Sequence, residues 1–219
     1  MDNYFVDLDG TIIDPKSGMI GAFRQALREI GYHDLASGDL DWVIGPPVIS
    51  SFAALLQKRE QAQDALRIYR RLYSPDGLLF DFSIYPDVLD AIAELHAMGR
   101  VFICTMKPAA LAEPILAKLG LTAKLFGAGL DGEIKTKDTI LDHAIRELAV
   151  HPSECLVIGD RASDMTAAGK TSMLALGVTW GYGTAAELRD AGADALCSSP
   201  RELSQIAKVL FSDKRELHK

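Results

Sequence analysis

The feature that most constrains this chain is a short apolar run near its start that ends in two carboxylates. Residues 4–6 have the pattern of a strand buried on both faces, and the residues that follow are Asp7-Leu8-Asp9-Gly10-Thr11. Buried charge costs free energy unless it is paired or bound to a cation. A magnesium site at the carboxyl end of a parallel sheet would account for these acids. An ordinary strand followed by an Asp-Gly turn is the alternative.

The rest of the chain alternates between strand and helix patterns. Buried-strand runs cover 101–104, 155–158 and 172–176, with a weaker one at 124–126, and helical spacing covers 87–98, 108–119, 137–148 and 163–168. This alternation predicts an α/β fold, with a Rossmann-like parallel sheet and right-handed crossovers.

A different pattern occupies the region from about residue 15 to residue 80. Helical spacing recurs there at 17–30, 48–56 and 59–73, and no strand pattern is found. An all-helical block between core elements predicts an inserted domain. The expected organisation is therefore a core domain of residues 1–14 and 84–219, with a helical domain of residues 15–83 inserted into it.

Composition limits the partners. The 219 residues carry a formal net charge of -7 and no long basic run, which argues against nucleic acid but not against a phosphorylated small molecule. Cys104, Cys155 and Cys197 are an odd number without disulfide or zinc spacing, and Cys104 and Cys155 are expected to be small core residues. Without a signal-like start or an apolar run near ~18 residues, we expect a cytoplasmic protein without membrane partners. Both a monomer and a homodimer remain open.

Two later strand or helix ends carry a hydroxyl and a cation. Thr105 follows the strand predicted at 101–104, where its hydroxyl and the amides of the next helix would hold a phosphoryl oxygen; helix capping is the alternative. Lys137 stands at the start of a predicted helix, where its charge opposes the helix dipole, and an anionic group within its reach would account for this placement. Lys135 and Lys107 are further candidates, and for each lysine solvent exposure is the alternative.

A third strand end carries two more acids. The strand predicted at 155–158 is followed by Gly159-Asp160 and, one helical turn later, by Asp164. Asp160 is expected to complete a metal site with Asp7, and Asp164 to orient a metal-bound water or Lys137. Capping of the following helix by Asp160 or Ser163 is the alternative.

Taken in order, Asp-x-Asp-Gly-Thr, a strand-end Thr, a Lys and Gly-Asp-x-x-x-Asp resemble the four motifs of the haloacid dehalogenase superfamily, over nearly the whole chain. The chain is most similar to the phosphoglycolate-phosphatase-like branch with a helical cap, and within it to a subgroup of phosphoglycolate phosphatases and 5'-nucleotidases. The stretches that carry the subgroup resemblance are Ile44-Gly45-Pro46-Pro47, Tyr69-Arg70, Thr105-x-Lys107-Pro108, Leu130-Asp131-Gly132, Gly159-Asp160-Arg161 and Trp180-Gly181-Tyr182-Gly183. Met106 departs from the pattern, which has a small polar residue there.

The resemblance implies a magnesium-dependent phosphatase that acts on a small phosphomonoester. Asp7 would attack phosphorus to give an aspartyl-phosphate, and Asp9 would serve as acid and then as base. Asp7, the backbone carbonyl of Asp9 and Asp160 would hold Mg²⁺. Thr105 and Lys137 would bind phosphoryl oxygens, with Asp164 in support.

The resemblance also implies substrate contacts. Gly10, Thr11 and Met106 in the core, and Arg70 and Gly45 in the cap, are the expected substrate-binding residues; for Arg70 a surface or salt-bridged arginine is the alternative. Phosphoglycolate and a nucleoside monophosphate are competing substrates. A β-phosphoglucomutase-like mutase and an inactive phospho-ligand-binding protein are the rival functions, the second disfavoured because every acid that the chemistry needs is present.

Overall fold

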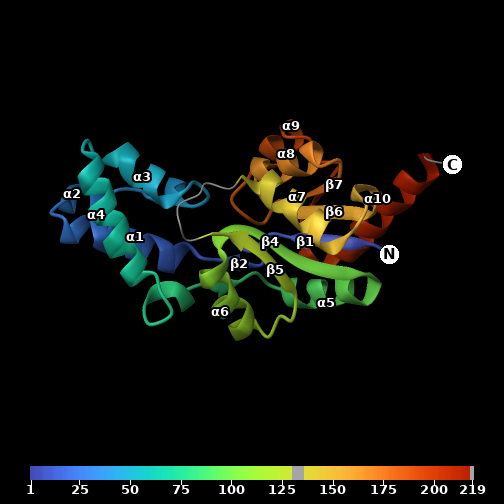
Figure 1. The fold of residues 1–219 in the computed structure, drawn as a ribbon, viewed down its shortest axis with the longest axis horizontal. Coiled ribbons are helices and arrows are strands. Elements are labelled where there is room, and N and C mark those ends of the chain that lie inside the picture. Colours follow the sequence, from blue (N-terminus) through green and yellow to red (C-terminus); the bar gives the residue numbers. More distant parts are fainter. Residues whose placement is uncertain (130–135, 218–219) are drawn as a thin grey trace. The chain divides into compact units, whose positions relative to one another are not determined.

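The computed structural model describes residues 1–129 and 136–217. Two compact units are formed, one from Met1–Ile13 with Ile84–Lys219, called here the core unit, and one from Asp14–Ser83, called the helical unit (Figure 1). At the two chain crossings, β2 (Ile13–Asp14) and β3 (Ser83–Ile84) pair as a two-stranded sheet. The stretch Leu130-Asp131-Gly132 and the candidate Lys135 lie outside the described residues.

A six-stranded parallel sheet forms the centre of the core unit, in the order β5-β4-β1-β6-β7-β8. The strands are β1 (Asn3–Val6), β4 (Arg100–Pro108), β5 (Lys124–Ala128), β6 (Cys155–Gly159), β7 (Leu174–Val178) and β8 (Ala195–Cys197). The helices between and after them are α5 (Val88–Met98), α6 (Ala109–Leu119), α7 (Lys137–Leu148), α8 (Ala162–Lys170), α9 (Ala185–Asp190) and α10 (Leu203–Leu217). The predicted α/β class and parallel sheet are confirmed.

Helices cover both faces of this sheet, and the residues of its central strands are mostly buried on both faces. All four residues of β1 are buried, and alternate side chains along a strand point to opposite faces. Phe5 belongs to a core cluster with residues of α7 and α8, while Tyr4 meets Phe211 of α10 edge to face, with ring centroids 5.9 Å apart. The sheet edge where the strands end is therefore held between two packed layers.

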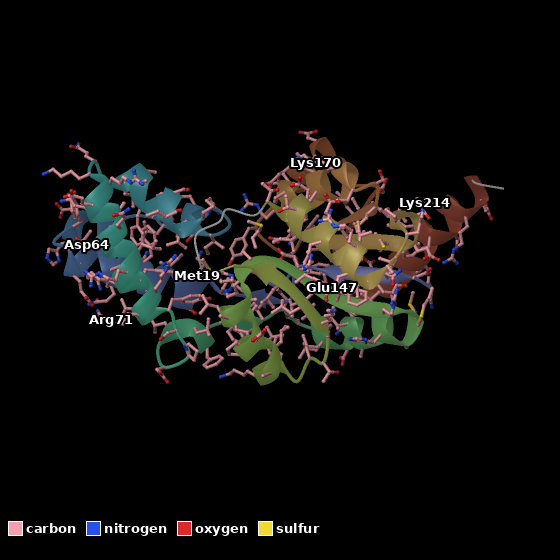
Figure 2. The ribbon with its side chains drawn as sticks, in the orientation of Figure 1. Met19, Asp64, Arg71, Glu147, Lys170 and Lys214 are labelled. Atoms are coloured by element: carbon pink, nitrogen blue, oxygen red, sulfur yellow. The ribbon has the colours of Figure 1, made fainter. Side chains whose placement is uncertain are left out.

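The helical unit contains α1 (Lys16–Glu29), α2 (His33–Ala36), α3 (Val48–Leu55) and α4 (Arg59–Leu72). Its core is aromatic: Phe23 of α1 stacks on Phe52 of α3 at 3.9 Å, and Tyr69 of α4 packs edge-on to both rings. The polar face of α4 includes Asp64 and Arg71, which are labelled in Figure 2; Arg71 pairs with Glu29 of α1 at 2.6 Å. The predicted all-helical character of this region is confirmed.

Strand β4 is longer than predicted. The apolar run ends at Cys104, but pairing with β5 continues to Pro108, with a shift of register between Thr105 and Pro108. Thr105 therefore does not cap α6, whose N-cap is Pro108. Short elements were also missed, among them α9 and β8. No helix among the described residues is long and apolar enough to cross a membrane.

Candidate active site

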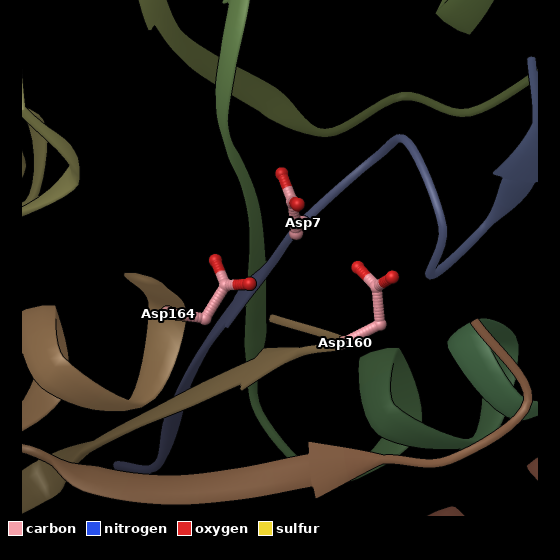
Figure 3. Close-up of side chains that lie close together, drawn as sticks. All are labelled: Asp7, Asp160 and Asp164. Atoms are coloured by element: carbon pink, nitrogen blue, oxygen red, sulfur yellow. The ribbon is translucent and has the colours of Figure 1, made fainter. Parts of the chain in front are cut away.

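Three buried carboxylates converge where β1 and β6 end. Asp7 directly follows β1, Asp160 directly follows β6, and Asp164 lies in the first turn of α8. Each offers an oxygen that lies within 4.8 Å of the others, and Figure 3 shows the three carboxylates facing a common space. Because β1 and β6 are hydrogen-bonded neighbours, residues 153 positions apart in sequence share one edge of the sheet.

One ammonium group joins two of these acids. Lys137 is the first residue of α7, and its Nζ lies 2.8 Å from Asp7 Oδ1 and 2.7 Å from Asp164 Oδ1. Its side chain is 3% exposed, so solvent exposure is excluded for this lysine. Both contacts are buried ion pairs, so the ammonium is held between the two carboxylates.

A second buried ion pair joins Lys107 to Asp9. Lys107 Nζ lies 3.0 Å from Asp9 Oδ1 and 2.9 Å from Asp9 Oδ2, and the lysine side chain is 3% exposed. The solvated alternative for Lys107 is therefore wrong. The amide of Lys107 donates to Thr105 Oγ1 at 3.1 Å, so the irregular end of β4 places the hydroxyl and the ammonium together.

Asp164, rather than Asp160 or Ser163, caps helix α8. The amide of the N-cap residue Arg161 donates to Asp164 Oδ2 at 3.1 Å, while Asp164 Oδ1 faces Lys137. The residue before Asp160 must be glycine for this approach, since a Cβ on Gly159 would lie 2.3 Å from the Asp164 carboxyl carbon. Asp164 therefore both stabilises the helix start and holds the lysine.

Burial and neighbouring negative charge raise the pKa values of Asp9, Asp160 and Asp164. Burial, assisted by the charge of Asp7, raises the pKa of Asp160 to about 7. Burial also raises the pKa of Asp164 to about 6, against the attraction of Lys137. For Lys137, burial lowers the pKa, but the carboxylates of Asp164 and Asp7 outweigh it and raise the pKa overall, so the ammonium stays charged. Burial raises the pKa of Asp9 despite Lys107.

These charges fit a divalent cation. Among the described residues, the Lys137 ammonium pairs with two of the three clustered carboxylates, and oxygen ligands of this kind are those that Mg²⁺ prefers. Asp160 accepts hydrogen bonds from the Tyr182 amide at 2.8 Å and the Thr11 hydroxyl at 3.4 Å, which orient it without supplying a full positive charge. A cation at the shared oxygens would supply the charge that the cluster lacks.

This electrostatic arrangement predicts how stability depends on pH. Without a cation, folded Asp160 and Asp164 bind protons that the unfolded chain, with carboxyl pKa values near ~4, releases. The free energy of unfolding should therefore fall as pH rises from about 4 to about 7, by on the order of a few kcal/mol. Urea unfolding in EDTA and in saturating Mg²⁺ tests this: the fall should be smaller with Mg²⁺, and identical pH slopes in the two conditions would contradict it.

The expected substrate-binding residues lie in both units. Gly10, at φ +84°, packs against the Asp160 carboxylate, and Thr11 directs its hydroxyl to the same group. The Met106 side chain is half-buried and packs against the core cluster. In the helical unit, Arg70 is exposed on α4 and Gly45 forms an exposed turn at φ +109°. Substrate contact by any of these residues stays a prediction.

Comparison with known proteins is consistent with this geometry. A family model described as haloacid dehalogenase-like hydrolase matches residues 1–170. A 5'-nucleotidase of Pseudomonas aeruginosa is 28% identical over 209 residues, which cover 93% of this chain and 94% of that protein. A plasmid-encoded phosphoglycolate phosphatase of Cupriavidus necator is 31% identical over 211 residues, covering 92% and 90%.

A solved structure has the same fold over almost its whole length. The crystal structure of a predicted phosphatase from Clostridium acetobutylicum superposes with a TM-score of 0.83 and 28% identity, covering 95% of this chain and 98% of that one. The family match covers well over half of the chain and includes Asp7, Asp9, Thr105, Lys137, Asp160 and Asp164. This chain therefore belongs to the haloacid dehalogenase-like hydrolase family.

Proposed function

We propose that the chain is a magnesium-dependent phosphatase that hydrolyses a small phosphomonoester through an aspartyl-phosphate on Asp7. The observation that carries this proposal is the buried cluster of Asp7, Asp160 and Asp164 with the Lys137 ammonium on two of its members. Such a cluster at the carboxyl end of a parallel sheet is suited to binding a cation together with an anionic substrate.

The reaction uses Asp7 as nucleophile and Asp9 as proton carrier. An Asp7 carboxylate oxygen forms a bond to phosphorus as the ester P–O bond breaks, and the departing alkoxide takes the proton of Asp9. Water then attacks phosphorus and gives a proton to Asp9, while the bond between phosphorus and Asp7 breaks. Inorganic phosphate is released, and both aspartates return to their starting state.

The remaining residues counter the negative charge. Asp7, the backbone carbonyl of Asp9 and Asp160 would hold Mg²⁺, next to Asp164. When bound, the ion supplies positive charge that offsets the repulsion between the Asp7 carboxylate and the phosphate. Lys137 adds positive charge beside Asp7, and the Thr105 hydroxyl, which accepts from the Lys107 amide, keeps its hydrogen to donate to a phosphoryl oxygen.

The Lys107–Asp9 pair predicts a selective loss. In Lys107→Met, Asp9 loses the ammonium that contacts both of its oxygens. Because that ammonium lowers the pKa of Asp9, its removal makes Asp9 a weaker acid, and protonation of the leaving group should become less efficient. We expect kcat/KM, which reports phosphoryl transfer to Asp7, to fall about 10² -fold for an alkyl phosphate. For an aryl phosphate with an acidic phenol, which needs little protonation, the fall should be at most a few-fold.

Lys124→Met is the matched control, because Lys124 is a lysine with an exposed ion pair on the surface. It should leave both kcat/KM values unchanged. Equal losses on alkyl and aryl phosphates in Lys107→Met would show that Lys107 does not act through Asp9.

A panel of phosphate esters, assayed with and without Mg²⁺, tests the proposed function. The names of the relatives favour phosphoglycolate first and a 5'-nucleotide second as substrate. Turnover that requires Mg²⁺ and is highest on one of these esters would support the phosphatase. Transfer of the phosphoryl group to a sugar would instead identify a mutase, and binding of phosphate analogues without turnover would identify a binding protein.

A further inference from the structure

The segment 179–183, which follows β7, packs against the base of the carboxylate cluster; we call it the strap. Its sequence is Thr179-Trp180-Gly181-Tyr182-Gly183. A Cβ on Gly181 would lie 2.2 Å from the Gly10 carbonyl oxygen and 2.4 Å from Asp160 Oδ2. A Cβ on Gly183 would lie 2.0 Å from the Asp160 carbonyl oxygen. Only glycine lets the strap come this close to Asp160.

Two hydrogen bonds join the strap to the candidate cation site. The Tyr182 amide donates to Asp160 Oδ2 at 2.8 Å, which fixes the rotation of that carboxylate. The Trp180 indole Nε1 donates to the Thr11 carbonyl at 3.0 Å, in the turn that also contains Gly10. Gly10 itself packs against Asp160, since a Cβ there would lie 2.2 Å from Oδ2. The strap and the Gly10–Thr11 turn thus both pack against the Asp160 carboxylate.

The strap is anchored at both ends. At its start, the Thr179 amide donates to the Cys197 carbonyl of β8 at 3.0 Å. Beyond its end, the Thr184 hydroxyl caps α9 by accepting from the Glu187 amide at 3.1 Å. Glu187 in turn accepts from the Ala162 amide at the start of α8, at 3.0 Å. Because both ends are fixed, a change in the strap is transmitted to Asp160 instead of being absorbed by the loop.

From these contacts, we propose that the strap is a positioning element for the cation site: it holds the Asp160 carboxylate in the orientation in which Asp160 binds a divalent cation with Asp7. This proposal rests on the proposed magnesium dependence. Hydrogen-bond partners behind a metal ligand commonly change metal affinity 10–100-fold when they are removed. A turn with a purely structural role would instead affect the stability of the cation-free protein and leave its affinity for Mg²⁺ unchanged.

Trp180→Phe tests the proposal, because phenylalanine keeps an aromatic ring and removes the indole donor to Thr11. The dissociation constant for Mg²⁺ is measured by calorimetry, and the thermal midpoint is recorded in EDTA and over a Mg²⁺ titration. We expect the dissociation constant to rise about tenfold, and kcat to recover when the Mg²⁺ concentration is raised. An unchanged dissociation constant would overturn the proposal, even if the midpoint in EDTA falls.

Gly181→Ala provides a stronger perturbation, and Gly169→Ala provides its control. The added methyl group at residue 181 would meet the Gly10 carbonyl and Asp160, whereas Gly169 in α8 has open space around a Cβ. We expect Gly181→Ala to weaken Mg²⁺ binding at least as much as Trp180→Phe, and Gly169→Ala to leave it unchanged. If Gly181→Ala does not fold, Trp180→Phe decides. A wild-type protein that does not bind Mg²⁺ would overturn the proposed magnesium dependence, and the strap proposal with it.

Discussion

Replacing Asp7 by Asn is expected to lower kcat by at least about 10⁴-fold, because the amide cannot form the acyl phosphate. Asparagine keeps the shape of the side chain, so substrate and cation pockets should change little. It also removes one negative charge from a cluster of three carboxylates, two of which pair with the Lys137 ammonium. Stability in EDTA should therefore not fall. Steady-state assays on the best ester of the panel, with urea unfolding in parallel, measure both effects.

Asp190→Asn is the matched control for this variant, because Asp190 is an exposed aspartate at the end of α9. It should leave both kcat and stability at wild-type values. An Asp7→Asn protein with a substantial part of the wild-type kcat would exclude Asp7 as the nucleophile.

The second large effect is expected for Lys137→Met, which should reduce both activity and stability. The ammonium lies between Asp7 and Asp164, and its removal leaves two buried carboxylates without their cationic partner. Breaking a buried ion pair in this way costs about 3–5 kcal/mol. Loss of the cation beside the phosphoryl group should lower kcat about 10³-fold. Urea unfolding in EDTA measures the first effect, and steady-state kinetics in saturating Mg²⁺ measures the second.

A double variant separates the two roles of Lys137. Adding Asp164→Asn removes one of the uncompensated charges, so Lys137→Met/Asp164→Asn should regain part of the lost stability but none of the lost kcat. A surface variant, Lys170→Met, should change neither quantity, because that lysine is largely exposed and its ion pair with Asp138 is 3.6 Å long. If Lys137→Met keeps wild-type stability in EDTA, the ion pairs contribute no net stability and this account of the cluster is wrong.

The positions of Asp7 and Asp160 follow from local sequence patterns. Each directly follows an apolar run, and an alternating α/β chain brings the carboxyl ends of its strands to one edge of the sheet. Lys137 can also be identified from the sequence, since a lysine at a helix start opposes the helix dipole and indicates an anionic partner. Each of these signals is contained within a few consecutive residues, so no tertiary information is needed to detect it.

The partner of Lys107 could not be predicted in the same way. Asp9 lies 98 residues away in sequence, and the pairing depends on the irregular register between Thr105 and Pro108. No local pattern encodes such a register shift. The close packing of Gly181 and Gly183 on Asp160 depends in the same way on tertiary geometry, although the Trp-Gly-Tyr-Gly sequence stands out.

The missed elements have two different explanations. Helix α9 and strand β8 contain six and three residues, too few for a periodic pattern to be distinguished from chance. Helix α10 can be predicted from the sequence, because its buried residues Leu203, Ala207 and Phe211 recur at four-residue spacing, as expected for one face of a helix.

Covalent trapping at Asp7 tests the central claim most directly. The protein is mixed with the best ester and Mg²⁺, quenched within the first turnovers and reduced with borohydride, which converts an acyl phosphate into an alcohol. We expect homoserine in place of aspartate at position 7 in the digested wild-type peptide. In the Asp7→Asn control, the aspartates at positions 9, 160 and 164 should remain unmodified. Steady turnover with an unmodified Asp7, or with the modification at another aspartate, would contradict it.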